Sequence, residues 1–147
     1  MSCTLQVGAG LVDSGRCIAF KPDDDTVYLV GTEEGELHLA TTQYSSQYLA
    51  SYPAHITPVY SLQWNPHHQE VFLSCAAEFV LKIWHREVTK APVWRLDLGG
   101  QAGAAAWAPY SATVLAAVTR DGRVTVWDLS VSRYAPLCVQ VGSRVVM

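Results

Sequence analysis

The stretch PVYSLQWNPHHQEVFLSCAAEFVLKIWH, residues 58–85, decides the fold. It opens with an alternating run that stops at Asn65 and Pro66, which indicates a strand followed by a turn. After a polar loop come an apolar run over residues 71–75, a small-residue turn, and a last apolar run that ends at Trp84. Three short strands so close together predict one antiparallel meander.

The same unit recurs before and after this stretch. The proline after the first strand is Pro22, Pro66 and Pro109 in the three copies, a spacing of 44 and then 43 residues. Three other landmarks keep this step. The aromatic residue of the first strand is Phe20, Trp64 and Trp107, and the turn residue is Gly35, Phe79 and Gly122. The last residue of the third strand is Ala40, Trp84 and Trp127. A strand-only period near 43 residues that ends in Trp-Asp is typical of WD40 propeller blades, and the chain resembles a WD40 protein over most of its length.

These repeats predict an all-β fold, a partial WD40 β-propeller of about three four-stranded antiparallel blades. The expected boundaries are residues 1–15 for an N-terminal segment with an outer strand near 4–7, 16–52, 53–98 and 99–140 for the three repeats, and 141–147 for a tail. Because propellers typically carry about four to eight blades, the chain is expected to be a piece of a larger propeller or a truncated form of one. Uncovered blade faces favour self-association.

Composition and charge argue against several classes of function. Half of the 147 residues are apolar and the net charge is −3, whereas binding to a nucleic acid backbone requires a basic surface. No apolar run approaches the length of a membrane span, and residues 1–10 lack the basic and apolar regions of a signal peptide, so a cytoplasmic location is expected. The four cysteines form no CxxC pair and are expected to be free thiols.

The second repeat carries a set of polar residues that the WD40 resemblance interprets. In that family a histidine, a strand Ser or Thr, an Asp in the next turn and the terminal Trp form a buried hydrogen-bond chain within one blade. The resemblance assigns these roles to His55, Ser74, Glu78 and Trp84, with Glu78 in place of the usual Asp. Such a chain would satisfy the polar atoms of a buried imidazole and tie the outer part of the blade to its inner strands.

The third repeat departs further from this pattern. It keeps Asp121 and Trp127, but it has Gln101-Ala102-Gly103 where the family carries Gly-His, and Ala117 at the Ser position. We therefore expect this blade to depend more on packing than on a hydrogen-bond network.

Catalytic and metal sites are disfavoured by the same residues. His55, Ser74 and Glu78 supply the groups of a hydrolase, but the repeat explains them as a brace, no GxSxG elbow accompanies them, and burial of both His55 and Ser74 would exclude the hypothesis. Adjacent His67 and His68 point apart in a turn, and no Cys or carboxylate lies at ligand spacing around them. No phosphate-binding glycine loop is present, so no enzymatic activity, metal or other cofactor is expected.

Surface recognition remains. Tyr and Trp are common anchors for protein partners, and several lie in expected loops or outer strands. The candidates are Tyr44, Tyr48, Trp94 and Tyr110. The alternative for each is that it packs between blades.

Several segments are more specific than a general WD40 repeat. They are VGTEEG at 30–35, YSSQ at 44–47, WNP at 64–66, KIW at 82–84 and WAPYS at 107–111. These segments resemble the propeller of axonemal dynein intermediate chains, most closely of the outer-arm type, over roughly residues 27–140. Departures are His85, in the place of the usual Asp, and the alanine run 104–106.

The resemblance implies a non-catalytic scaffold subunit of the axonemal dynein motor, in the cytoskeleton of cilia or flagella. In that family the propeller docks on the dynein heavy chain, which hydrolyses ATP, and works beside another dynein intermediate chain. Light chains bind a separate N-terminal region, so their binding is not carried over to these residues. The alternative is a WD40 interaction adaptor of a different multiprotein complex, such as a ubiquitin ligase or a trafficking complex, because the repeats alone permit it.

Overall fold

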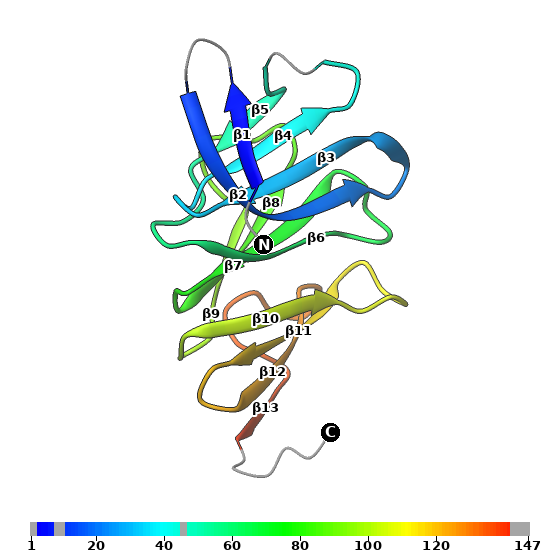
Figure 1. The fold of residues 1–147 in the computed structure, drawn as a ribbon. Helices are drawn as coiled ribbons and strands as arrows, with labels where there is room; N and C mark the ends of the chain where they lie inside the picture. The colour runs from blue at the N-terminus through cyan, green and yellow to red at the C-terminus, as the bar shows by residue number, and fades with distance from the viewer. Residues whose placement is uncertain (1–2, 8–10, 45–46, 142–147) are drawn as a thin grey trace.

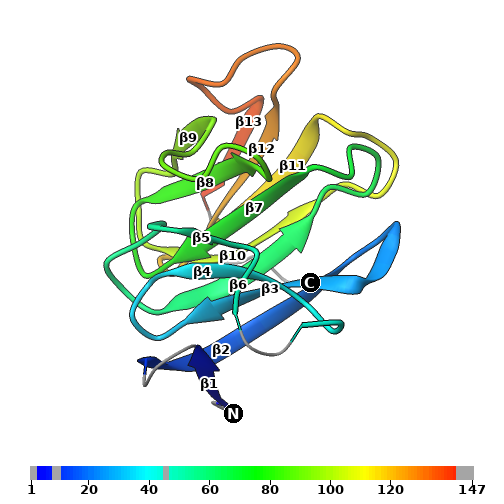
Figure 2. The same ribbon diagram turned by 90° about the horizontal axis from the view of Figure 1, so that it is seen from above.

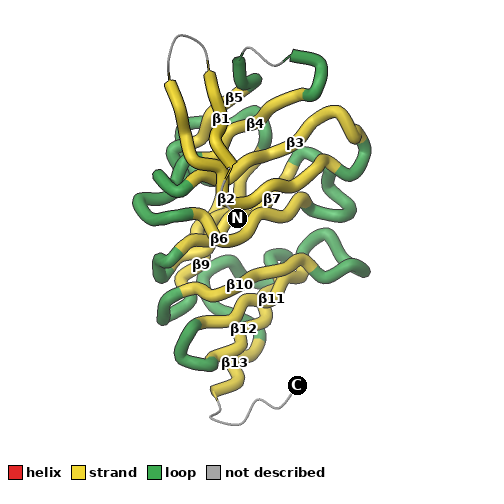
Figure 3. The backbone as a smooth tube through the Cα atoms, viewed as in Figure 1, coloured by secondary structure: helices red, strands yellow, loops and turns green. Residues whose placement is uncertain are grey.

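The computed structural model describes residues 3–7, 11–44 and 47–141, with side chains described from Ser14 onward within those ranges. All regular elements in these ranges are β-strands, arranged as three antiparallel sheets stacked in chain order (Figure 1, Figure 3). The predicted all-β fold of antiparallel blades is confirmed. Nowhere in the described ranges is there a helix long and apolar enough to cross a membrane.

The first sheet has five strands rather than four. Its strands, in spatial order, are β1 (Cys3–Val7), β2 (Leu11–Lys21), β3 (Asp24–Thr32), β4 (Leu37–Thr41) and β5 (Ala50–Tyr52). The strand expected over 4–7 is present, but it forms a hairpin with the first half of β2, with Cys3 opposite Gly15 and Val7 opposite Leu11. β2 therefore begins well before residue 16, where the repeat was expected to start.

The second and third sheets have four strands each. They are β6 (Val59–Trp64), β7 (Val71–Ala76), β8 (Val80–His85) and β9 (Trp94–Asp97), then β10 (Ala102–Trp107), β11 (Val114–Thr119), β12 (Arg123–Asp128) and β13 (Cys138–Val141). The last strand is short and begins only at Cys138. Pro136, which cannot donate a ladder hydrogen bond, lies in the loop just before it. Residues 142–147 of the expected tail lie outside the described ranges.

The register repeats with the spacing of the sequence. In each sheet one residue from each of the three inner strands lies in a row across the ladder: Phe20, Tyr28 and Ala40, then Trp64, Phe72 and Trp84, then Trp107, Leu115 and Trp127. The first and last residues of these rows are those that the sequence repeat had aligned, so the 43- to 44-residue step is a structural step from blade to blade.

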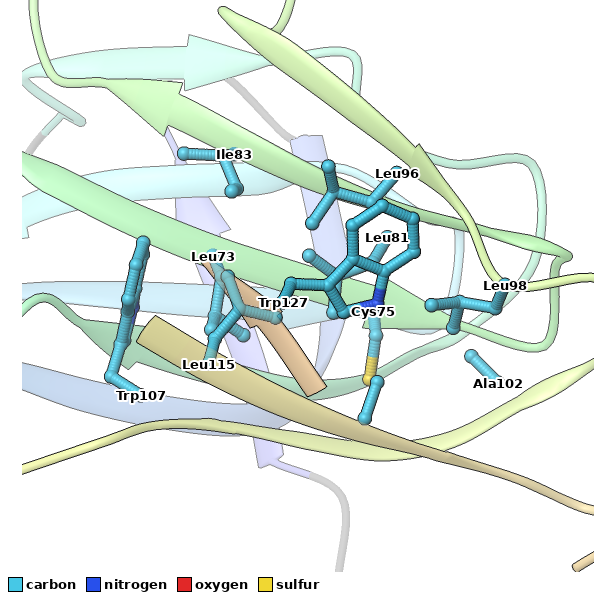
Figure 4. Close-up of a cluster of buried hydrophobic side chains, with 11 residues drawn as sticks. Leu73, Cys75, Leu81, Ile83, Leu96, Leu98, Ala102, Trp107, Leu115 and Trp127 are labelled. Carbon is cyan, nitrogen blue, oxygen red and sulfur yellow. The ribbon is translucent and has the colours of Figure 1, made fainter. Parts of the chain in front are cut away.

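Two apolar cores lie between successive sheets. β6 packs against β2 and β3, and β10 packs against β6 and β7, so neighbouring blades lie side by side in both views (Figure 1, Figure 2). The first core joins buried residues of the first and second sheets, including Leu29, Leu39, Tyr52, Trp64, Phe72 and Trp84. The second joins the second and third sheets through Leu73, Cys75, Leu81, Ile83, Leu96, Trp107, Leu115 and Trp127 (Figure 4).

Candidate functional site

The structure brings the four polar residues of the second repeat into contact. The indole Nε1 of Trp84 donates to Ser74 Oγ at 3.0 Å, and Ser74 Oγ lies 2.9 Å from His55 Nε2. On the other side of the ring, His55 Nδ1 lies 3.2 Å from Glu78 Oε2. Because a carboxylate accepts, His55 carries its proton on Nδ1, and the Ser74 hydroxyl then donates to Nε2. The extra methylene of Glu78, relative to Asp, does not prevent the contact.

This network links two blades. Ser74 lies on β7 and Trp84 on β8, whereas His55 lies in the connection from β5 to β6. The His55 backbone N–H donates to the carbonyl of Gly35, in the turn between β3 and β4, at 2.9 Å. Gly35 has φ +95°, and a Cβ there would lie 2.0 Å from the His55 carbonyl oxygen, so only glycine fits. The histidine is thus held by its backbone to the first sheet and by its side chain to the second.

The electrostatics of the network match a buried brace. The side chain of His55 is fully buried, and burial lowers its pKa despite the opposing hydrogen bond and charge of Glu78. Burial alone would raise the pKa of Glu78, but hydrogen bonds from the Ile56 backbone and from His55 leave it lowered. Ser74 is also fully buried. Since neither His55 nor Ser74 is open to solvent, the hydrolase hypothesis is excluded.

The third sheet does not assemble an equivalent chain. Trp127 Nε1 donates to Thr125 Oγ1 at 3.1 Å, and Thr125 Oγ1 donates to the Ala117 carbonyl at 3.4 Å. Asp121 accepts instead from the hydroxyl of Thr119. Sequence reasoning missed Thr125 as the partner of the Trp127 indole. The signal was their spacing, because residues two apart on a strand lie on the same face.

A charged cluster between the first two sheets was also missed. Lys21 is nearly buried, although it is a lysine: its Nζ lies 3.2 Å from Glu70 Oε1 and 5.9 Å from the centre of the Trp64 ring, and it also bonds Asp23. Burial lowers the pKa of Lys21, but the two carboxylates outweigh it and the pKa is raised. Arg86 completes the cluster at 3.9 Å from Glu70. The signal was a lysine directly before Pro-Asp-Asp at the end of an apolar strand.

Each junction between blades also contains the same indole hydrogen bond. Trp64 Nε1 donates to the carbonyl of Ala19 at 3.1 Å, and Trp107 Nε1 donates to the carbonyl of Gln63 at 3.3 Å. Ala19 and Gln63 occupy the same position of the repeat, one residue before Phe20 and Trp64. Trp64 and Trp107 therefore each fix their blade against the preceding one.

The four aromatic candidates for partner binding differ in exposure. Tyr44 is 64% exposed and Tyr110 is 78% exposed. Tyr48 is half-buried and stacks on His38 with ring centres 4.1 Å apart, and Trp94 is half-buried against the second core. Tyr44 and Tyr110 are thus the two that present most of their surface to solvent.

His67 and His85 make hydrogen bonds with the backbone. His67 Nε2 lies 2.8 Å from the Pro109 carbonyl, and His85 Nδ1 accepts the backbone N–H of Glu87 at 3.2 Å. Within the described ranges no cluster of three or more His, Cys, Asp or Glu has the arrangement of a metal site.

The sheets, their repeated register and a family comparison together define the class. The family described as "WD domain, G-beta repeat" matches residues 46–85, the repeat that contains the His55 network. The stacked antiparallel sheets are consistent with blades of a partial WD40 propeller, and residues 46–85 match the repeat itself.

Comparison with curated proteins is more specific. The chain is 46% identical over 126 residues to the ciliary dynein intermediate chain 2 of Heliocidaris crassispina, a match that covers 86% of the chain and 18% of that protein. It is 40% identical over 129 residues to dynein axonemal intermediate chain 4 of Mus musculus, covering 88% and 16%. It is 41% identical over 133 residues to the 78 kDa intermediate chain of the flagellar outer arm of Chlamydomonas reinhardtii, covering 86% and 19%.

The chain is thus a homologue of part of the axonemal dynein intermediate chains, and the resemblance found in the sequence is confirmed. It spans less than a fifth of the length of these relatives.

Proposed function

We propose that the chain forms part of a non-catalytic scaffold subunit of axonemal dynein in cilia or flagella. The observation that carries the proposal is the identity of 40–46% to ciliary, axonemal and flagellar outer-arm dynein intermediate chains over most of the chain. The fold agrees with such a role, because the His55 network is buried and braces the blades rather than facing a substrate.

In this proposal the blades dock on the dynein heavy chain and assemble with another dynein intermediate chain. Docking requires exposed anchors, and large aromatic side chains are the most frequent ones. Tyr44, in the connection between β4 and β5, and Tyr110, in the turn between β10 and β11, are the best placed of the candidates by exposure. Trp94 and Tyr48 are half-buried and would contribute less of their surface.

The test is an affinity pull-down of the tagged chain from an extract of ciliated cells, read by mass spectrometry. The expected result is recovery of a dynein heavy chain and a second intermediate chain. A variant with Tyr44→Ala and Tyr110→Ala should recover less heavy chain, whereas Val131→Ala, another exposed position, should recover the same amount as the natural chain.

Two outcomes would contradict the proposal. Recovery of ubiquitin-ligase or trafficking subunits without dynein would support an adaptor of another complex. Recovery of chaperones alone, from a chain that circular dichroism shows to be folded, would mean that these blades do not contain the docking surface.

A further inference from the structure

The two junctions between blades are filled by different side chains near the end of the first strand of each repeat, at Lys21 and at Asn65. At the first junction, Lys21, Glu70 and Arg86 form the charged cluster described above. The repeat spacing of 44 and 43 residues places Asn65, Thr113 and Leu129 at the same positions of the second junction. These side chains are shorter or apolar, so they cannot form the same cluster.

A pocket of about 260 Å³ lies where the cluster would be. Asn65, Thr113 and Leu129 all line it, together with Ile83, Trp94 and Trp107. Ile83 and Trp107 lie at one end of the second core, opposite Leu98 and Ala102 (Figure 4).

The polar atoms of Asn65 in this wall are already used. Its Nδ2 donates to the Ala112 carbonyl at 2.8 Å, and its Oδ1 accepts the backbone N–H groups of His67 and His68 at 2.9 Å each. The pocket therefore presents a mainly apolar surface.

Its size fits one aromatic side chain better than a whole small molecule. Sites for drug-sized ligands usually measure about 300–1,000 Å³, whereas an apolar cavity of about 150 Å³ already takes up benzene. The tryptophan rings of Trp94 and Trp107, which pack in the second core, line the pocket and could contact the edge or the face of an inserted ring.

The polar residues that line the pocket favour an acidic neighbour for this ring. His68 and His85 both line it, with ring centres 6.3 Å apart. Because His85 Nδ1 accepts the Glu87 N–H, the neutral ring carries its proton on Nε2 and can donate there. None of the described residues that line the pocket is an Asp or Glu. A carboxylate on the ligand would thus find donors, and an ammonium group would find no charged partner.

We propose that the pocket between the second and third blades binds a segment of a protein partner in which one aromatic side chain lies next to an acidic residue. The aromatic ring fills the pocket, and the carboxylate is bound by His85 and His68. The inference rests on the shape and chemistry of this junction and holds whether or not the partner is a dynein heavy chain.

The first test uses four synthetic hexapeptides, acetylated and amidated at their ends. One contains the core Asp-Phe, two replace the Asp by Asn or Lys, and one replaces the Phe by Ala. Each is titrated into the ¹⁵N-labelled 147-residue chain while the indole N–H signals of Trp94 and Trp107 are followed by NMR. The Asp-Phe peptide should shift these signals and bind about tenfold more tightly than the Lys-Phe and Asp-Ala peptides.

Variants then assign the binding to the pocket. Thr113→Glu combined with Leu129→Arg copies Glu70 and Arg86 of the first junction and should weaken binding of the Asp-Phe peptide by at least about tenfold. Leu137→Arg, at an exposed position of the loop just before β13, is the control and should leave binding unchanged.

Two single variants separate the role of charge from that of shape. His85→Ala should remove the preference for Asp-Phe over Asn-Phe while the dependence on Phe remains. Val93→Glu places a carboxylate at an exposed position that lines the pocket, so it preserves the core and should reverse the preference from Asp-Phe to Lys-Phe.

Three results would overturn the proposal. They are unmoved Trp94 and Trp107 signals, equal binding of the Asp-Phe and Lys-Phe peptides by the natural chain, and undiminished binding by the filled double variant. Circular dichroism of each variant checks its fold. If the double variant unfolds, the reversal of the peptide preference by Val93→Glu still tests the proposal.

Discussion

Trp84 shows how much one residue contributes to this fold. Its indole is fully buried, stacks with Phe72 at 6.5 Å between ring centres, contacts the Tyr52 ring edge-on, and donates its N–H to Ser74. Packing and hydrogen bonding therefore converge on one side chain that faces the first blade from the second. Removing it opens a cavity and leaves a buried hydroxyl with one partner fewer.

Trp84→Ala is expected to lower the free energy of unfolding by about 3–5 kcal/mol. Urea denaturation followed by circular dichroism measures the change. Tyr110→Ala removes an exposed aromatic side chain and serves as the control, with an expected change below about 0.5 kcal/mol. A loss below about 1 kcal/mol for Trp84→Ala would contradict its role in the core.

The pKa of His55 predicts a dependence of stability on pH. Burial lowers this pKa below its ordinary value of 6.5, so below pH 6.5 the unfolded chain binds a proton that the folded chain does not. The contribution of His55 is therefore complete above pH 6.5 and is lost as the pH falls below it. Glu78, whose pKa is lowered, contributes above its ordinary value of 4.5 and is lost at still lower pH.

His55→Gln should show a smaller loss of stability than the natural chain when the pH falls from neutral to just above 4.5. Denaturation midpoints across this range, measured for both chains, give the difference directly. Parallel pH profiles of the two chains would show that His55 does not titrate differently in the folded and unfolded states.

At the scale of the elements, the repeat predicted most strands but not their ends. Alternation and turn residues located β6–β8 and β10–β12 well. The facing sides of these two groups of strands pack against each other in the second core, so their apolar residues follow a clear pattern. β1 and the first half of β2 have little alternation, so their hairpin could not be read from a pattern. The outer strands β5 and β13 are short, since few contacts hold an outer edge.

Side-chain networks followed the same division. The His55, Ser74, Glu78 and Trp84 contacts were anticipated because a family pattern fixes their spacing. The Lys21 cluster at the first junction and the pocket at the second junction each bring together side chains from two different sheets. These side chains meet only after the two sheets have packed. Such meetings have no local signature.

The turn between β3 and β4 carries a prediction of its own. Gly35→Ala would place a Cβ 2.0 Å from the His55 carbonyl in a left-handed conformation, and should cost more than about 1 kcal/mol of stability. Gly100→Ala is the control, because its Cβ would meet neighbours no closer than 3.5 Å. Thermal unfolding of both variants measures the effect, and equal stabilities would show that the turn relaxes without cost.

At the scale of the whole molecule, both outer blade faces expose apolar side chains. Ile18 and Phe20 on the first sheet are 58% and 53% exposed, and Val118 and Val139 on the third are 37% and 48% exposed. Their counterparts inside the molecule are covered by the next blade. Such faces favour association with a partner or with a second copy.

The isolated chain is therefore expected to self-associate as its concentration rises. Sedimentation velocity should show a larger species that is lost when Ile18→Lys and Phe20→Lys are combined, because both charges disrupt one apolar face. The double variant Tyr44→Lys and Tyr110→Lys changes charge equally at other exposed sites and should still associate. A monomer at all concentrations would contradict the expectation.

The indole bond at each junction gives the row of blades a direction. The middle blade has a hydrogen-bond donor, Trp64, on the side of the first blade and an accepting carbonyl, that of Gln63, on the side of the third blade. At the two outer faces, the donor position holds Phe20, which has no N–H, and the acceptor position holds Ala106. Two copies joined end to end would lack the bond that both internal junctions share. A strand that carries a tryptophan at the position of Phe20 could donate this bond to the Ala106 carbonyl, so the outer face of the third sheet would suit such a strand better than a second copy of the first sheet.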